Sequence, residues 1–338
     1  MPIWSEILRE LSQTAAPGAA PDFDGVRRRY LAELQKHTGR NVVLYASGWL
    51  QKDAPPPLIS INDEDIHAFM EVTSGLRGTN LDLILHSPGG SPEATEGIVS
   101  YLRSRFQQIR VIVPELAMSA ATMISCAANE ILMGKHSFLG PIDPQLLVST
   151  QLGRRSVPAQ AVLDQFDKAQ QECQDPAKLS AWLPMLSQYG PDLLVQCETA
   201  LSLSRELVST WLKTYMFDGM SNLDEREQRA ESLSAWLSDH TTFKSHSRHL
   251  SRSELQDHGL IVSPLENDEK LQDLSLSVFH ATTHTFSGTS AAKIVENHAG
   301  RAFIKHFRVP QQAQALQIDI GPGQSNQPAG MNPPLLSD

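Results

Sequence analysis

The stretch that decides the fold covers residues 81–144 and reads LDLILHSPGGSPEATEGIVSYLRSRFQQIRVIVPELAMSAATMISCAANEILMGKHSFLGPIDP. It opens with an apolar strand, predicted over 81–86, which runs directly into Ser-Pro-Gly-Gly at 87–90. A helix is predicted over 92–106, and Ser91 suits its N-cap position. The first corner of this stretch is therefore a strand-to-helix turn built on two adjacent glycines.

A second strand-to-helix corner follows along the chain. An apolar strand predicted over 110–113 leads into a run of small residues around Ser119, where a second helix is predicted over 118–128. Further strands are predicted over 41–48 and 130–133. Strands and helices that alternate in this way predict an α/β layer fold with a mostly parallel sheet.

The two corners together predict a site for acyl transfer. Ser119 stands at the start of a helix, where the backbone N–H of Ala120 is open to a developing negative charge. Gly89 or Gly90 would supply a second N–H donor, because glycine lets the backbone approach a substrate closely. Acyl transfer requires a nucleophile and such donors side by side. The alternative is a tight contact between small residues of a helix and a sheet, without chemistry.

Three motifs, in this order, carry a family resemblance: Leu85–Gly90 (LHSPGG), Met118–Ala121 (MSAA) and Gly140–Gln145 (GPIDPQ). The chain resembles the protease side of the Clp protease/crotonase superfold, which includes Clp peptidases, signal peptide peptidase A and the serine dehydrogenase proteinases. The likeness is strong over about 40–150, weaker over 151–265 and absent after that. It implies a Clp/crotonase-like ββα superfold with a mostly parallel sheet and appended helices.

The resemblance also implies a function. It implies a serine endopeptidase that cleaves unfolded or extended polypeptide through an acyl-enzyme on Ser119, forms a homo-oligomer and needs no cofactor or metal. A second hypothesis is a catalytically inactive oligomeric scaffold of the same fold that binds peptides. A third is a crotonase-type acyl-CoA enzyme, which shares the oxyanion geometry but needs no serine. The serine context argues against the third.

The general base has several candidates. Where Clp peptidases carry a histidine, the sequence has Asp143, which could orient a base, bind a substrate amide or cap a turn. Signal-peptide-peptidase-like enzymes use a Ser-Lys dyad, and Lys168, which lies 49 residues after Ser119, is the favoured base on this resemblance. Burial would have to lower the pKa of this lysine, whereas pairing with the nearby Asp164 would raise it. His246 is a further candidate, because a histidine needs no large pKa shift for this role.

Composition excludes several classes of protein. The formal net charge of −10 argues against a general nucleic-acid-binding surface. The three cysteines lack the spacing of a zinc site or a disulfide framework, which favours reduced thiols in a cytoplasmic protein. No signal peptide and no apolar run of membrane-spanning length is recognised, so we expect a cytoplasmic protein without a membrane span.

Changes in composition divide the chain into four predicted parts. Residues 1–39 hold N-terminal helices and a linker, and 40–265 form the Clp/crotonase-like serine peptidase domain. Residues 266–308 are predicted as a helical extension that could bind a partner protein. The last part, 309–338, is rich in Pro, Gln, Gly, Asn and Ser and is predicted to be disordered.

Overall fold

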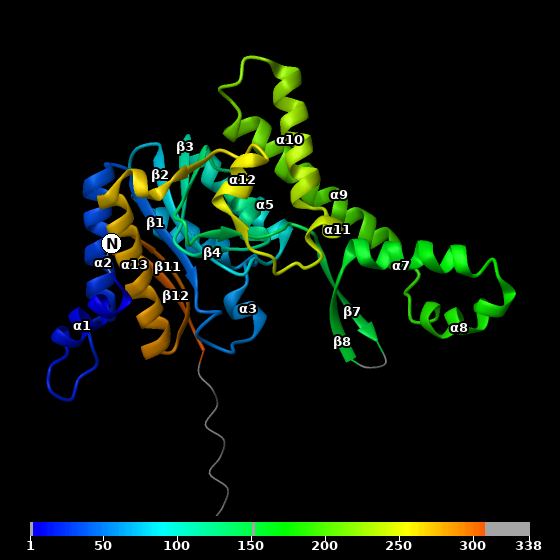
Figure 1. Cartoon of the computed structure of the whole chain (residues 1–338). Coiled ribbons are helices and arrows are strands. Elements are labelled where there is room, and N and C mark those ends of the chain that lie inside the picture. Colours follow the sequence, from blue (N-terminus) through cyan, green and yellow to red (C-terminus); the bar gives the residue numbers. More distant parts are fainter. Residues whose placement is uncertain (1–2, 151–152, 308–338) are drawn as a thin grey trace, which may run out of the picture. The chain divides into compact units, whose positions relative to one another are not determined.

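The computed structural model describes residues 3–150 and 153–307 (Figure 1). Residues up to Phe307 form one compact unit. The tail predicted to be disordered, 309–338, lies outside the described residues. Among the described residues, no helix has both the length and the apolar character that crossing a bilayer requires.

A seven-stranded sheet is the centre of the fold. Its strands, in spatial order, are β10 (Val262–Pro264), β5 (Glu130–Met133), β3 (Gln108–Val113), β2 (Asn80–His86), β1 (Asn41–Ser47), β11 (Ala291–Asn297) and β12 (Ala302–His306). The first five are parallel to one another, and β11 and β12 are antiparallel to their neighbours. The prediction of an α/β fold with a mostly parallel sheet is confirmed.

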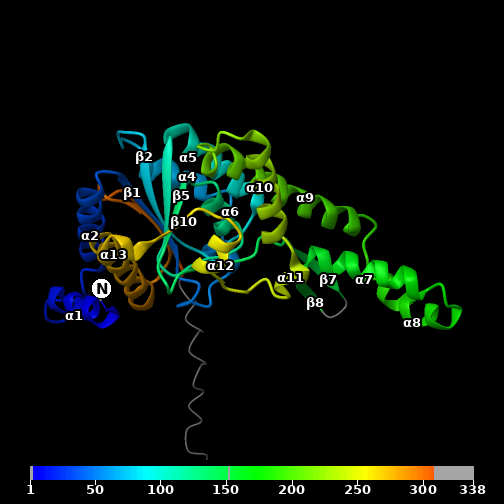
Figure 2. The ribbon, with the colours of Figure 1, turned by 45° about the horizontal axis from the view of Figure 1, so that its top comes forward.

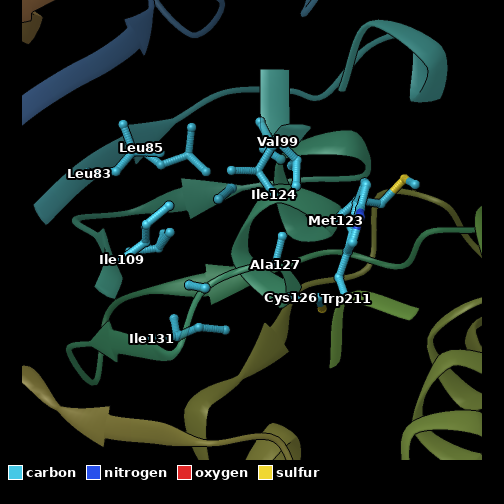
Figure 3. Close-up of a cluster of buried hydrophobic side chains, with 14 of the residues drawn as sticks. Leu83, Leu85, Val99, Ile109, Met123, Ile124, Cys126, Ala127, Ile131 and Trp211 are labelled. Atoms are coloured by element: carbon cyan, nitrogen blue, oxygen red, sulfur yellow. The ribbon is translucent and has the colours of Figure 1, made fainter. Parts of the chain in front are cut away.

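Helices cover both faces of this sheet (Figures 1 and 2). On one face, α4 (Asp65–Thr73), α5 (Pro92–Arg105) and α6 (Ala120–Cys126) share a buried apolar cluster with Leu83 and Leu85 of β2. Figure 3 shows part of this cluster. On the other face, α2 (Phe23–Thr38) and α13 (Glu269–Gly288) pack on a second cluster that includes β2 residue Ile84. Because both faces are covered, the central strands read as continuous apolar runs.

Local signals in the sequence explain where α5 begins and ends. The Ser91 hydroxyl accepts a hydrogen bond from the Ala94 N–H, and Pro92 occupies the first turn, where its missing N–H costs nothing. Arg103 and Arg105 lie in the last turn, where positive charge favours the helix dipole. The helix therefore starts directly after the glycine pair, at the carboxyl end of β2.

Residues 145–211 form a hairpin and three helices, and the last of these helices returns to the main apolar core through Val208 and Trp211. They comprise β7 (Gln145–Thr150), β8 (Gly153–Pro158), α7 (Ala159–Glu172), α8 (Pro176–Leu186) and α9 (Leu193–Trp211). This segment has a small apolar cluster of its own, which includes Val162 and Cys197. No strands were predicted over 145–158, so the hairpin is an addition to the prediction.

The remaining elements are short or peripheral. A three-stranded sheet consists of β4 (Leu116–Ala117), β6 (Phe138–Leu139) and β9 (Leu250–Ser251). The helices are α1 (Trp4–Thr14), α3 (Pro56–Ile59), α10 (Leu223–Leu237), α11 (His240–Phe243) and α12 (Arg252–Asp257), with a π-helical turn at Leu212–Met216 and a 3₁₀ turn at Leu265–Asn267.

The helical prediction for 266–308 is right only for its first half. Residues 269–288 form α13, but 291–306 form β11 and β12 of the main sheet. Every residue of β11 is buried, including Lys293 and Glu296. Charged residues at buried strand positions hide the apolar pattern that would have indicated a strand.

Candidate active site

Ser119 has an unusual backbone conformation. It immediately precedes α6, with φ 53° and ψ −118°. Within residues 3–150 and 153–307, Lys244 is the only other non-glycine residue with a positive φ. Such a conformation costs on the order of 1–3 kcal/mol and is found more often at functional sites than elsewhere. The side chain of Ser119 is partly exposed, although the helix behind it is entirely buried.

The glycine corner packs directly against this serine. A short parallel bridge joins the two corners, in which the Met118 N–H donates to the Ser87 carbonyl over 2.9 Å. Gly89 has φ 99°, and a Cβ there would lie 2.6 Å from Cβ of Ser119. Only glycine fits this position, because both its conformation and its contact exclude a side chain.

Two backbone N–H groups at this junction are available to a ligand. The Gly89 N–H is used, because it donates to Oγ of Ser87 over 3.2 Å. The N–H groups of Gly90 and Ala120 find no acceptor in the part of the chain that the structure describes. Donors of this kind, fixed next to a nucleophile, are what an oxyanion hole requires.

The third sequence motif lies against the same corner. The Thr122 hydroxyl of α6 lies 2.8 Å from the Ala117 carbonyl and accepts from the Gly140 N–H over 3.0 Å. This side chain therefore joins the Ser119 corner to the segment that contains Asp143. The three motifs that carry the family resemblance meet at one place in the fold.

A cavity of about 300 Å³ opens at this place. Its walls come from the glycine corner, the start of α6, the start of the β7 hairpin and α9. The lining residues are Gly90, Ser91, Pro92, Glu93, Ser119, Met123, Ile142, Pro144, Gln145, Leu146, Ala200, Leu203 and Ser204. The lining is largely apolar, and a peptide side chain fits a cavity of this kind.

Asp143 lies behind the cavity wall, between two lining residues, and binds two histidines. Its side chain is 1% exposed. Oδ1 is 2.6 Å from Nδ1 of His246, and Oδ2 is 2.9 Å from Nδ1 of His240. Gln145 also donates to Oδ2. Because a carboxylate only accepts, Nδ1 of each ring carries a proton, and in the neutral ring Nε2 is the basic nitrogen. An aspartate that orients a histidine in this way is typical of serine hydrolases.

Lys168 lies on α7, where its side chain is exposed. Neither Lys168 nor His246 is among the residues that line the cavity. The neighbouring Asp164 accepts a hydrogen bond from Gln160. A dyad of Lys168 with Ser119 therefore stays a prediction.

His240 is the residue of this site that the sequence analysis missed. It begins α11, and Asp143 lies 97 residues earlier in the chain. No motif surrounds it, and its spacing to His246 matches no known pattern. The only available signal was the presence of a second histidine close to a histidine that was already a candidate.

A comparison with known proteins finds a family match over part of the chain. Residues 58–180 match the family model of ClpP-like SDH-type serine proteinases. This match covers little more than a third of the chain. The resemblance that the three motifs predicted is thereby confirmed, and the match supports a serine protease. It includes both corners, Asp143 and Lys168, but neither histidine.

Individual relatives match over shorter stretches or at low similarity. Two uncharacterized proteins of Methanocaldococcus jannaschii, MJ0137 and MJ1495, are 47% and 44% identical to this chain over 66 residues. Each match covers 20% of this chain and 23% of the relative. The solved structure of the membrane-bound stomatin-specific protease 1510-N is 14% identical, with a TM-score of 0.33 over 60% of this chain and 75% of that one.

Proposed function

We propose that this protein is a serine endopeptidase that cleaves unfolded or extended polypeptide through an acyl-enzyme on Ser119. The observation that carries the proposal is the strained Ser119 packed against Gly89, with two unused N–H groups beside it at a cavity. A silent scaffold would gain nothing from the strain at the serine, whereas a nucleophile gains exposure from it.

The reaction follows from this arrangement. Oγ of Ser119 attacks the scissile carbonyl carbon while the base takes the hydroxyl proton. The N–H groups of Gly90 and Ala120 stabilise the oxyanion. The intermediate then breaks its C–N bond, and the leaving amine takes the proton from the base. Water, which gives a proton to the same base, then attacks the acyl carbon; the C–Oγ bond breaks, Oγ of Ser119 takes that proton back, and the second product leaves as a carboxylic acid.

We assign the role of base to His246, oriented by Asp143. The 2.6 Å contact between them and the partial burial of the ring support this choice over the exposed Lys168. The Ser-Lys dyad is the competing assignment. Alanine substitution of His246 and of Lys168 distinguishes the two assignments.

A substrate would lie along one side of the glycine corner. On the other side, the Ile61 N–H already donates to the Gly89 carbonyl, and the Ile61 carbonyl accepts from the Ser91 N–H. An extended peptide can therefore add only at the side to which the Gly90 N–H points. We propose that the enzyme acts in the cytoplasm and self-associates, with exposed apolar residues of the hairpin and α8, such as Leu147 and Leu183, in the contact.

Labelling of the full chain by a fluorophosphonate probe tests the proposal. We expect Ser119→Ala to abolish labelling and His246→Ala to slow it by roughly 100-fold or more. Lys168→Ala and the control His306→Ala, at an exposed histidine that does not contact Asp143, should stay near the wild-type rate. If Lys168→Ala loses labelling and His246→Ala does not, the base is the lysine. Absence of labelling of folded wild type at every pH tested would instead favour the scaffold.

A further inference from the structure

The position of the glycine corner depends on one neighbouring segment, centred on Ile61. The Ile61 N–H donates to the Gly89 carbonyl over 2.8 Å, and the Ser91 N–H donates to the Ile61 carbonyl over 3.0 Å. A Cβ on Gly90 would lie 2.1 Å from the Ile61 carbonyl oxygen. Because Gly90 meets Ile61 through its two neighbours, its own N–H points to the opposite side, where the cavity lies.

A buried ion pair between Lys293 and Asp65 binds the opposite edge of the segment around Ile61. Nζ of Lys293 donates to the Ser60 carbonyl over 2.7 Å and lies 2.8 Å from both carboxylate oxygens of Asp65. Oδ2 of Asp65 accepts from the Asn62 N–H over 3.1 Å. The pair therefore binds the peptide groups on either side of Ile61, and both of its side chains are fully buried.

We propose that Lys293 and Asp65 act as a positioning pair, which fixes Ile61 and thereby aims the Gly90 N–H at the oxyanion. The inference rests on the proposed function and deepens it. Lys293 comes from β11, which lies outside the segment that matches the proteinase family. Strand β11 would thus contribute to the oxyanion hole without touching the substrate.

Energetic considerations support a positioning role rather than a stabilising one. Removing two charges from water costs several kcal/mol per ion, and an apolar pair of similar volume is often at least as stable. A third group, the Tyr45 hydroxyl, donates to Oδ2 of Asp65 over 2.7 Å and completes the network. A fully bonded network of this kind fixes geometry, and oxyanion donors act only when placed within a few tenths of an ångström.

A second lysine provides a matched control. Lys305 of β12 lies 2.9 Å from Glu64 and 3.7 Å from Asp65. Its contact with Asn62 is with the side-chain oxygen, at 3.4 Å. It therefore shares the charge environment of Lys293 but binds neither peptide group next to Ile61.

The test compares Lys293→Met with Lys305→Met in the full chain. Hydrogen exchange is followed at the Ile61 and Ser91 amides, together with the rate at which a fluorophosphonate labels Ser119. We expect Lys293→Met to speed exchange at both amides by roughly 10-fold or more and to slow labelling roughly 10- to 100-fold, less than loss of a whole donor would cost. Lys305→Met should leave both rates close to the wild type.

A second variant covers the case in which Lys293→Met does not fold, since it leaves Asp65 buried without a partner. Lys293→Met combined with Asp65→Asn removes both charges and still releases the Ser60 carbonyl, so the same changes are expected. Wild-type exchange and labelling in either folded variant overturn the proposal. So does failure of both variants to fold, because the pair would then be required by the fold itself.

The two proposals fail in different ways. If folded wild type is not labelled, the serine peptidase assignment fails, while the exchange of the Ile61 and Ser91 amides still measures the positioning effect. If wild type is labelled and Lys293→Met behaves like it, only the positioning role is lost.

Discussion

At the scale of single residues, the backbone of Ser119 should store strain that stability measurements can detect. A φ of 53° with a ψ of −118° is easily adopted by glycine but not by serine or alanine. We therefore expect Ser119→Gly to be more stable than Ser119→Ala, with a free energy of unfolding about 1 kcal/mol larger. Neither variant should react with a fluorophosphonate. Denaturant unfolding of the two inactive variants makes the comparison. Equal stabilities would show that the conformation is not strained.

Gly89 should tolerate no side chain at all. A Cβ would lie 2.6 Å from Cβ of Ser119 and 2.7 Å from the Met118 carbonyl oxygen, at a φ that disfavours alanine. We expect Gly89→Ala to lower the free energy of unfolding by about 2–4 kcal/mol and to abolish labelling.

The matched control is Gly97→Ala, in the middle of α5. Nothing lies within 4 Å of a Cβ at that position. Alanine favours a helix interior by roughly 0.5–1 kcal/mol, so this variant should be as stable as wild type or more stable. Thermal unfolding of both variants, with labelling in parallel, separates a local clash from a general effect of alanine.

At the scale of secondary-structure elements, the sequence predicted what depends on local signals and missed what depends on distant partners. The corners at 87–90 and 118–121 were predictable, because an apolar strand followed by small residues specifies them locally. The strands over 291–306 were not, because the burial of Lys293 depends on Asp65, more than 200 residues away in the chain. Likewise, nothing near His240 indicates that it binds Asp143.

Those two C-terminal strands should be indispensable. β11 pairs with β1 over five residues and covers its edge. A chain that ends at Gly288 would expose that edge and lose the Lys293 contacts, so we expect it not to fold cooperatively. A chain that ends at Phe307 keeps both strands and should retain the wild-type midpoint of thermal unfolding. Circular dichroism of the two truncated chains tests this, and a cooperative transition in the shorter one would contradict it.

At the scale of the whole molecule, one buried histidine should limit stability in acid. Burial lowers the pKa of His86 from 6.5 to about 3. In the unfolded chain, His86 therefore binds a proton as the pH falls through about 6.5, whereas in the folded chain it stays neutral until about pH 3. Stability is lost as pH falls through this window, by about 4–5 kcal/mol in total.

Replacing this histidine should reduce that loss. His86→Asn has no group that titrates in the window, and its side-chain oxygen can still accept from the Leu116 N–H, as Nδ1 of His86 does over 3.4 Å. Urea unfolding at about pH 7 and about pH 4.5 should show a smaller difference for this variant than for wild type. The exposed His306, changed to Asn, should leave the difference unchanged. If His86→Asn lost as much stability in acid as wild type, the buried ring would not be the cause.

The order of strands in the sheet also shows that the segment matching the proteinase family lacks the strands that flank it in the fold. Residues 58–180 contain β2, β3 and β5 of the main sheet, while the strands on either side, β1 and β10, come from outside that range. Expressed alone, this segment would present two unpaired strand edges, on β2 and on β5, each a template for pairing with another copy. The segment that matches the proteinase family is therefore expected to aggregate when expressed alone, and we expect the flanking strands β1 and β10 to prevent this by covering its edges.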